Sequence, residues 1–150
     1  QSGLPICLMH MQGQPKTMQH TPGYNDVVGE VIDYLSGRAA ACVAEGIDRS
    51  LLLVDPGFGF GKTLQHNLAL LNRLQTIVAL GYPVLVGLSR KSLIGEVLGR
   101  DVSQRLAGSL ALAVLAAERG ASIIRVHDVA ETVDAIKLCE AVARAQMPQD

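Results

Sequence analysis

The stretch Leu51-Leu-Leu-Val-Asp-Pro-Gly-Phe-Gly-Phe-Gly-Lys-Thr63 decides the fold of this 150-residue chain. Four apolar residues run into Asp55, and a loop follows in which glycine stands at every second position. An uninterrupted apolar run is typical of a parallel strand covered on both faces, and Thr63 can cap the start of a helix. The stretch therefore predicts a buried strand, a ligand-binding loop and a helix in succession.

The loop glycines, Gly57, Gly59 and Gly61, fit neither common phosphate-binding motif. A Walker loop needs four residues between its first glycine and its Gly-Lys pair, and this chain has three. The dinucleotide pattern GxGxxG is replaced here by GxGxG. A tight turn that merely tolerates glycine stays open as an alternative. Phe58 and Phe60, the only phenylalanines of the chain, favour a flat aromatic ligand at this loop.

The composition favours a single domain over residues 1–150. Hydrophobic residues make up 49% of the chain, and a formal net charge of -1 gives no basic surface for nucleic acid. Three widely spaced cysteines predict reduced thiols in a cytoplasmic protein. The longest nearly apolar run, Leu106–Ala117, is too short to cross a membrane. The chain begins Gln1-Ser-Gly and soon enters an apolar run, which we interpret as the start of a fragment.

Short apolar runs alternate with longer amphipathic segments along the whole chain. The predicted strands are Leu4–Met11, Leu51–Val54, Pro83–Leu88 and Ser122–Val126. The predicted helices are Asp26–Glu45, Leu64–Leu80, Ser89–Leu98, Ser103–Arg119 and Ala130–Ala145. Repeated strand–helix units predict a parallel α/β sheet with right-handed crossovers. Periodicity leaves two architectures open, an open doubly wound sheet and part of a (β/α)8 barrel.

Reactive side chains follow each predicted strand in turn. They are His10 and Gln12, then Asp55, then Ser89, Arg90, Lys91 and Ser92, and finally Arg125, His127 and Asp128. In both architectures the carboxyl ends of parallel strands meet at one edge, where ligands bind. The sequence therefore predicts one site built from all four strand ends.

Two kinds of chemistry are expected at this edge. Asp55 is either a brace for its Asp-Pro turn or a carboxylate that accepts two N–H groups from a 2-amino-4-oxo heterocycle. The Ser89–Ser92 segment is either solvated charge or an anion site at a helix start. Arg125 and His127 point to one face of a strand, and we expect them to hold phosphate or pyrophosphate. A lone histidine there would more often be a core or capping residue.

The remaining histidines receive no role. His20 and His66 lie in a loop and on a helix, and the four histidines of the chain lack metal-site spacing.

Four motifs together closely resemble the dihydropteroate synthase family. They are Met9–Thr17, Asp55–Lys62, Gly87–Ser92 and Arg125–Asp128, in the order and at separations similar to those of the family. The resemblance covers essentially the whole chain and favours the barrel over the open sheet. It implies that residues 1–150 are the C-terminal half of a pterin-binding TIM (β/α)8 barrel, about strands 5–8.

The resemblance implies an enzyme of folate biosynthesis with a pterin slot. Such enzymes condense 6-hydroxymethyl-7,8-dihydropterin pyrophosphate with para-aminobenzoate, giving 7,8-dihydropteroate and pyrophosphate. It places Asp55 at the amino-pyrimidine edge of the pterin and Lys91 at a ring oxygen or nitrogen. Met9 and Gly87 are expected to line the slot.

The resemblance also assigns the leaving group and the second substrate. Arg125 is expected to stack on the pterin and, with His127, to hold the departing pyrophosphate. The aminobenzoate pocket, which sulfonamides also occupy, is expected to be formed by Pro15, Gly59, Phe60 and Ser89. Lys91, Arg125 and His127 are the expected catalytic residues, because cations stabilise departing negative charge.

The resemblance finally implies that this chain is an incomplete half. The ligand for Mg2+ and further pterin-binding residues are expected in the missing N-terminal half, with none of the metal ligands in this chain. We expect part of a pterin pocket without turnover, and a homodimer whose contacts include Ser103–Arg119 and Ala130–Ala145. Three alternatives stay open: a methyltetrahydrofolate methyltransferase, a non-catalytic barrel fragment, and two half barrels that close on each other.

Overall fold

The computed structural model describes residues 3–145 and has a parallel α/β fold. Strand β1 (Ile6–Met9) pairs with β2 (Leu52–Asp55), and β3 (Leu85–Val86) pairs with β4 (Ile123–Ile124), both in parallel. A parallel bridge between Val54 and Val84 joins the two pairs. The four strands therefore lie side by side in chain order, as strand–helix repeats predict.

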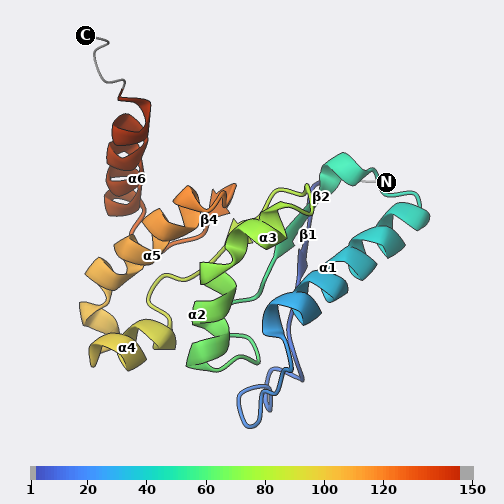
Figure 1. The fold of residues 1–150 in the computed structure, drawn as a ribbon, viewed down its shortest axis with the longest axis horizontal. Coiled ribbons are helices and arrows are strands. Elements are labelled where there is room, and N and C mark those ends of the chain that lie inside the picture. The colour runs from blue at the N-terminus through green and yellow to red at the C-terminus, as the bar shows by residue number, and fades with distance from the viewer. Residues whose placement is uncertain (1–2, 146–150) are drawn as a thin grey trace.

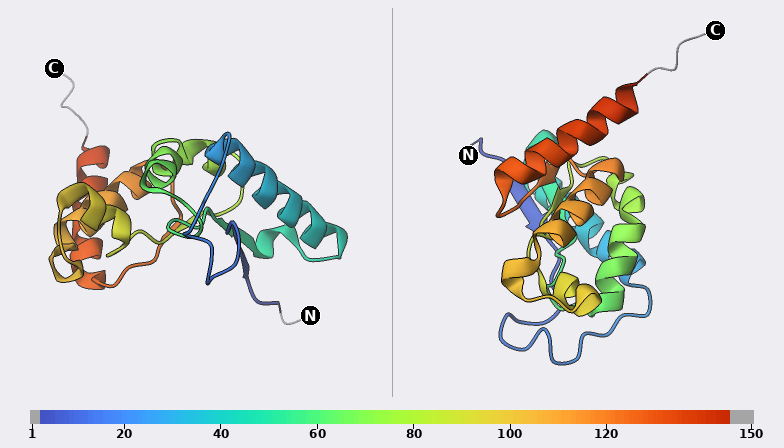
Figure 2. Two further views of the ribbon diagram at one scale, coloured as in Figure 1. Left: turned by 90° about the horizontal axis from the view of Figure 1, so that it is seen from below. Right: turned by 90° about the vertical axis from the view of Figure 1, so that its left-hand side faces the viewer.

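Helices follow each strand and extend over the length of an elongated molecule. They are α1 (Val27–Ala44), α2 (Leu64–Asn72), α3 (Leu74–Val78), α4 (Ser92–Leu98), α5 (Leu106–Glu118) and α6 (Val129–Arg144), with short 3-10 turns η1 (Arg49–Leu51) and η2 (Val102–Gln104). Figures 1 and 2 show α1 and α6 at opposite ends of the molecule. No helix within residues 3–145 has the length and apolar character needed to cross a membrane.

The observed elements are shorter than several of the predicted ones. In the first, third and fourth strands only the central residues form the paired ladder. The predicted helix Leu64–Leu80 is two helices, since α2 ends at Asn72 and α3 begins at Leu74. The Thr76 hydroxyl donates to the Arg73 carbonyl at 2.7 Å, a side-chain bond that competes with regular helix bonding at this break.

The starts of the last three helices also differ from prediction. Helix α4 begins at Ser92 rather than Ser89, because residues 87–91 form the turn that leaves β3. The predicted helix Ser103–Arg119 is divided into η2 and α5. Helix α6 begins at Val129, one residue before the predicted start.

Helix caps explain two of the starts that the sequence predicts well. The Asp26 carboxylate accepts from Val28 N at 3.1 Å and caps α1. Thr63 caps α2, and its hydroxyl accepts from His66 N at 3.2 Å. His66 Nδ1 in turn accepts from Thr63 N at 3.2 Å, which closes a capping box. His66, which was assigned no role, therefore has a structural partner.

The two faces of the sheet are buried very differently. Val54, Val84 and Val86 have no exposed surface and belong to the core with apolar side chains of α1 and α2. Side chains alternate along a strand, so their neighbours Leu53, Leu85 and Ile123 lie on the other face. That face is less covered, and Ile123 is 44% exposed. The same alternation places Asp55, Gly87 and Arg125 on this second face.

Candidate active site at the carboxyl ends of the strands

The backbone just beyond β1 and β4 continues the pairing and brings the polar strand ends together. His10 N donates to the Asp55 carbonyl at 3.0 Å, one residue past the end of β1. Arg125 N donates to the Val86 carbonyl at 2.8 Å, one residue past the end of β4. Residues that are distant in the sequence thus share one edge of the sheet.

Asp55 combines the bracing role and the ligand-binding role that the sequence left open. The residue is 3% exposed, and its Oδ1 accepts from Gly57 N at 2.7 Å. Among residues 3–145, Oδ2 accepts no hydrogen bond and lies 3.8 Å from Arg125 Nη2. Burial raises the pKa of Asp55, although the Gly57 N–H and the cations of Arg125, Lys91 and Lys62 oppose that rise. One oxygen therefore braces the loop, and the other remains available to a ligand.

Two loop glycines are required by close backbone contacts. Gly57 has φ 70°, and a Cβ there would overlap the carbonyl oxygen of His10. Gly61 has φ 64°, and a Cβ there would overlap the carbonyl oxygen of Gln12. Both the positive φ and the contact exclude larger residues. The alternative in which the turn merely tolerates glycine is therefore wrong at these two positions.

Lys91 crosses the glycine loop and contacts its aromatic side chain. Its Nζ donates to the Phe58 carbonyl and lies 4.5 Å from the centre of the Phe60 ring. A Cβ at Gly59 would lie 3.2 Å from Lys91 Cδ, so this glycine makes room for the lysine stem. Burial lowers the pKa of Lys91 to about 8, partly offset by Asp55 and reinforced by Arg125. The ammonium is thus cationic at neutral pH and lies against an aromatic face.

The two phenylalanines do not share a role. Phe58 is 1% exposed and packs in the hydrophobic core, whereas Phe60 is half-buried beside Lys91. The prediction that both rings lie beside a ligand is therefore wrong for Phe58. The loop turns this side chain into the apolar interior, because burying a whole ring is strongly favourable.

Arg125 lies over the third strand end and faces the second. A Cβ at Gly87 would lie 3.1 Å from Arg125 Nη2, so the guanidinium passes directly above this glycine. The Arg125 side chain is 60% exposed, in contrast to the buried Asp55 carboxylate. A planar cation next to a buried carboxylate suits a planar ligand that hydrogen-bonds at its edge and stacks on its face.

Ser89 and His127 hold each other at the ends of β3 and β4. The Ser89 hydroxyl accepts from His127 N at 3.2 Å, and the same oxygen lies 3.0 Å from His127 Nδ1. Ser89 is buried, whereas His127 is exposed. The serine therefore orients the imidazole and leaves the other ring nitrogen to the solvent side.

Arg90 is held by an ion pair with Asp128. Its guanidinium makes two bonds to the Asp128 carboxylate, of which Nε to Oδ2 measures 3.1 Å. This partner lowers the pKa of Asp128. Arg90 has φ 58°, and its backbone N donates to the Ser109 hydroxyl at 3.0 Å. The anion cluster expected at Ser89–Ser92 therefore keeps Lys91 and loses Arg90 to an ion pair.

Met9 and Pro15, two further predicted site residues, differ in burial. Met9 is half-buried at the end of β1, opposite Asp55, and its Cγ lies close to Gly57. Pro15 is exposed in the loop between β1 and α1. The same loop reaches the site through Gln19, whose amide donates to the Gly59 carbonyl.

Sequence reasoning missed two buried polar residues that support the loop. Lys62 is 3% exposed, and its Nζ bonds to His10 and to two loop carbonyls. Asn67 is 4% exposed; its Oδ1 accepts from Gly59 N at 2.8 Å and its Nδ2 donates to Thr63 O at 2.8 Å. The position of Lys62 directly after the last loop glycine was the only signal in the sequence.

Metal-ligating side chains do not cluster in the part of the chain that the structure describes. Between residues 3 and 145, no group of three or more His, Cys, Asp or Glu side chains could hold a metal ion. Asp55 Oδ1 accepts from Gly57 N, and the Asp128 carboxylate pairs with Arg90. The location of the Mg2+ ligand in the N-terminal half stays a prediction.

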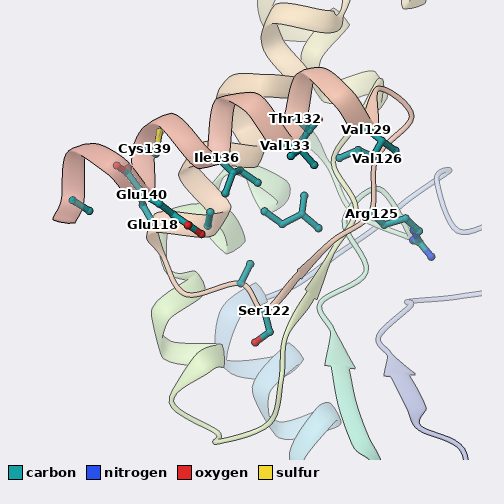
Figure 3. A pocket seen from close by; sticks show the side chains of 14 residues that line it. Glu118, Ser122, Arg125, Val126, Val129, Thr132, Val133, Ile136, Cys139 and Glu140 are labelled. Atoms are coloured by element: carbon teal, nitrogen blue, oxygen red, sulfur yellow. The ribbon is translucent and has the colours of Figure 1, made fainter. Parts of the chain in front are cut away.

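A cavity of about 710 Å³ lies beside the polar cluster rather than within it. It separates α6 from β4 and is lined mainly by apolar side chains, with Glu118 and Glu140 near one end. Figure 3 shows Val133 and Ile136 directed into this space and Arg125 at its margin, pointing away from α6. An apolar groove of this kind suits packing by protein rather than binding of a polar substrate.

Comparison with known proteins identifies similar sequences. The profile of a family described as pterin binding enzyme matches residues 1–127. The dihydropteroate synthase of Escherichia coli (strain K12) is 56% identical over 146 residues, which is 97% of this chain and 52% of that protein. The Haemophilus influenzae protein of the same name is 53% identical over 142 residues, which is 95% of this chain and 52% of that protein. The chain thus spans about half the length of these curated relatives.

Solved structures agree with these relatives. The Yersinia pestis dihydropteroate synthase in complex with a sulfonamide drug superposes with a TM-score of 0.92 at 52% identity. The superposition covers 96% of this chain and 53% of the Yersinia pestis protein. The Xanthomonas albilineans dihydropteroate synthase in complex with 7,8-dihydropteroate gives a TM-score of 0.88 at 50% identity, over 95% of this chain and 52% of that protein.

Proposed function

The chain belongs to the family of pterin binding enzymes, and from this premise we infer that it is part of a dihydropteroate synthase. The enzyme would be a transferase of folate biosynthesis that joins 6-hydroxymethyl-7,8-dihydropterin pyrophosphate to para-aminobenzoate. Relatives of that name, 56% and 53% identical to this chain, support the inference. The complexes of related enzymes with 7,8-dihydropteroate and 4-aminobenzoic acid support the two substrates.

The observation that carries the proposal is the buried Asp55 carboxylate with an available Oδ2. This oxygen can accept N–H groups from the amino-pyrimidine edge of a pterin, and burial strengthens such bonds. The Arg125 guanidinium above Gly87 can stack on the same ring. Lys91 can donate to a ring oxygen or nitrogen, and Met9 closes the slot beside Gly57.

The same cations can promote departure of pyrophosphate. Bond cleavage at the pterin methylene leaves negative charge on pyrophosphate and a cation-like carbon, which the arylamine then attacks. Arg125 and His127 are exposed and can hold that anion. Lys91, with a pKa near 8, adds positive charge at neutral pH. Fixed charges of this kind stabilise the transition state without reorganisation, so no nucleophilic side chain is needed.

The aminobenzoate pocket is proposed at the glycine loop. The half-buried Phe60 ring and the Gly59 backbone offer a flat wall, and Ser89 lies at the neighbouring strand end. Pro15, on the exposed loop whose Gln19 bonds to Gly59, is proposed to cover the pocket when substrate is present. Because sulfonamides resemble aminobenzoate, we expect them to compete for this pocket, as the Yersinia pestis complex suggests.

The fold supports the proposal that these four strands are the second half of a (β/α)8 barrel. Strands β1 and β4 lie at the two edges of the sheet, and the face that carries Asp55 is incompletely covered. An N-terminal half of similar length would pair with both edges and fill the groove under α6. We propose that this half carries the Mg2+ ligand and the remaining pterin contacts.

Assembly and location are proposals of the same kind. Leu138 and Val142 on α6 are 69% and 70% exposed, and with α5 they are proposed to contribute to a homodimer contact. We expect a cytoplasmic enzyme.

Calorimetry with 6-hydroxymethylpterin tests the pterin site. We expect the 150-residue chain to bind the pterin, and Asp55→Asn to weaken binding at least tenfold, because an amide offers one acceptor and no charge. Asp33→Asn, an exposed carboxylate on α1, is the matched control and should bind like the unmodified chain. Equal binding by the Asp55 and Asp33 variants would exclude Asp55 as the pterin anchor.

A further inference from the structure

Lys62 uses every hydrogen of its ammonium group inside the protein. Nζ donates to Gly57 O at 3.0 Å and to Phe60 O at 3.1 Å, and it lies 2.9 Å from His10 Nδ1. An ammonium has three N–H donors and no acceptor, so these three partners satisfy it completely. The side chain therefore links both ends of the glycine loop to the residue that follows β1.

This arrangement is costly, which argues for a positional role. Lys62 is 3% exposed, and within residues 3–145 it forms no ion pair with a carboxylate. Burial lowers its pKa to about 8, partly offset by the charge of Asp55 and reinforced by Lys91. An apolar side chain would avoid this desolvation but could not hold the two carbonyl groups.

His10 is prepared to act as the third acceptor. Burial and the neighbouring Lys62 lower the pKa of His10 to about 4, although the His10 backbone bond and Glu30 oppose this change. The imidazole is therefore neutral near pH 7, and its Nδ1 can accept from the ammonium. The ring is also held edge-on by Tyr34, with centroids 5.0 Å apart.

We propose that Lys62, bonded to His10, is a positioning residue that fixes the glycine loop between Asp55 and Phe60. Gly57, whose carbonyl Lys62 binds, is the residue whose N–H braces the Asp55 carboxylate. Phe60, whose carbonyl Lys62 also binds, carries the ring beside Lys91. Lys62 thus sets the pterin anchor and the aromatic wall together. The inference deepens the proposed function, on which only its ligand measurement rests.

Amide hydrogen exchange on Lys62→Met tests this role directly. Methionine is an unbranched side chain one atom shorter than lysine, and it removes all three donors. We expect exchange at the amides of Gly57, Gly59 and Phe60 to become at least tenfold faster, while the interior of α1 changes by less than threefold. Lys137→Met, on the exposed face of α6, should leave the loop unchanged. Unchanged loop exchange in Lys62→Met, or a uniform rise over the whole chain, would overturn the proposal.

The acceptor side of the pair gives an independent test should Lys62→Met fail to fold. His10→Phe removes the acceptor and keeps a ring, whereas His10→Asn can place an amide oxygen near the Nδ1 position. We expect fast loop exchange in the phenylalanine variant and near-native exchange in the asparagine variant. Equal exchange in these two variants would overturn the proposal.

Pterin calorimetry on the same variants separates the two claims. If the unmodified chain binds no pterin while the loop amides respond as expected, the proposed function fails and the role of Lys62 stands. If the chain binds pterin and Lys62→Met binds equally well with native loop exchange, the role of Lys62 fails and the pterin site stands.

Discussion

The Asp55 carboxylate on β2 lies 3.8 Å from the Arg125 guanidinium beyond β4, although 70 positions separate them in the chain. The carboxylate is 4% exposed at its side chain, and the guanidinium is 60% exposed. A buried carboxylate thus faces a solvent-accessible guanidinium, which passes above Gly87. This geometry links the pterin edge, which we assign to Asp55, to the leaving anion, which we assign to Arg125.

Arg125→Met should raise the pKa of Asp55. The guanidinium is one of the groups that oppose the rise caused by burial, so its loss leaves the carboxylate with less compensation. A carbon-detected NMR titration of the Asp55 carboxyl measures the change. The control is Arg144→Met on α6. Arg144 pairs with Glu140 and not with Asp55. A pKa of Asp55 that falls or stays constant in Arg125→Met would contradict the assignment.

Acid should destabilise the fold through His10. Its pKa is about 4 in the folded chain and near 6.5 when unfolded, so the unfolded state binds more protons between these values. The unfolding free energy should therefore decrease as the pH falls from about 6.5 to about 4. Lys62, Tyr24 and Tyr34 contact the ring, and the charge of Glu30 only partly offsets the cost of protonation.

The control for this pH dependence is His10→Asn, which cannot titrate. Urea unfolding measured between pH 4 and pH 7 should show a flatter profile in that variant. Parallel profiles for the variant and the unmodified chain would assign the acid sensitivity to other groups.

Gly57→Ala should destabilise the chain and loosen the loop. A left-handed backbone costs a non-glycine residue about 1–2 kcal/mol. The overlap with the His10 carbonyl at this position adds to that cost. Gly37→Ala is the matched control, because it lies within α1 with open space around it and should gain about 0.5–1 kcal/mol. Urea midpoints compare the two, and an equal response at both positions would contradict the requirement for glycine at 57.

Phe60→Leu should weaken aminobenzoate more than pterin. The substitution removes the aromatic face beside Lys91 and keeps an apolar side chain, so the Asp55 contacts remain. Competition binding of 4-aminobenzoic acid and 6-hydroxymethylpterin to the enzyme with both barrel halves distinguishes the two effects. Equal weakening of both ligands would indicate that Phe60 acts on the whole loop.

Local signals explain what the sequence predicted correctly. Asp26 and Thr63 mark helix starts because their short side chains bond to backbone N–H groups two or three residues on. The apolar run before Asp55 predicts a buried strand, because a strand with both faces covered needs apolar side chains on both faces. Strand β2 is buried in this way, with only Leu53 partly exposed. Polar residues after each strand mark the site because parallel strands share a direction.

The remaining features depend on contacts between distant residues. Phe58 and Phe60 have the same local sequence pattern. Their roles differ because Phe58 packs in the core beneath the loop, whereas Phe60 lies beside Lys91. Arg90 is removed from the anion cluster by Asp128, 38 residues away. Lys62 finds its third acceptor 52 residues earlier in the chain. No periodicity or spacing encodes such pairings.

A fused protein tests the central claim most directly. The N-terminal half of the Escherichia coli relative would be joined to this chain, and formation of 7,8-dihydropteroate would be measured with both substrates and Mg2+. We expect product from the fusion, at least a hundredfold less from its Asp55→Asn variant, and none from the 150-residue chain alone. Equal rates with and without the Asp55 carboxylate, or robust turnover by this chain alone, would contradict the account.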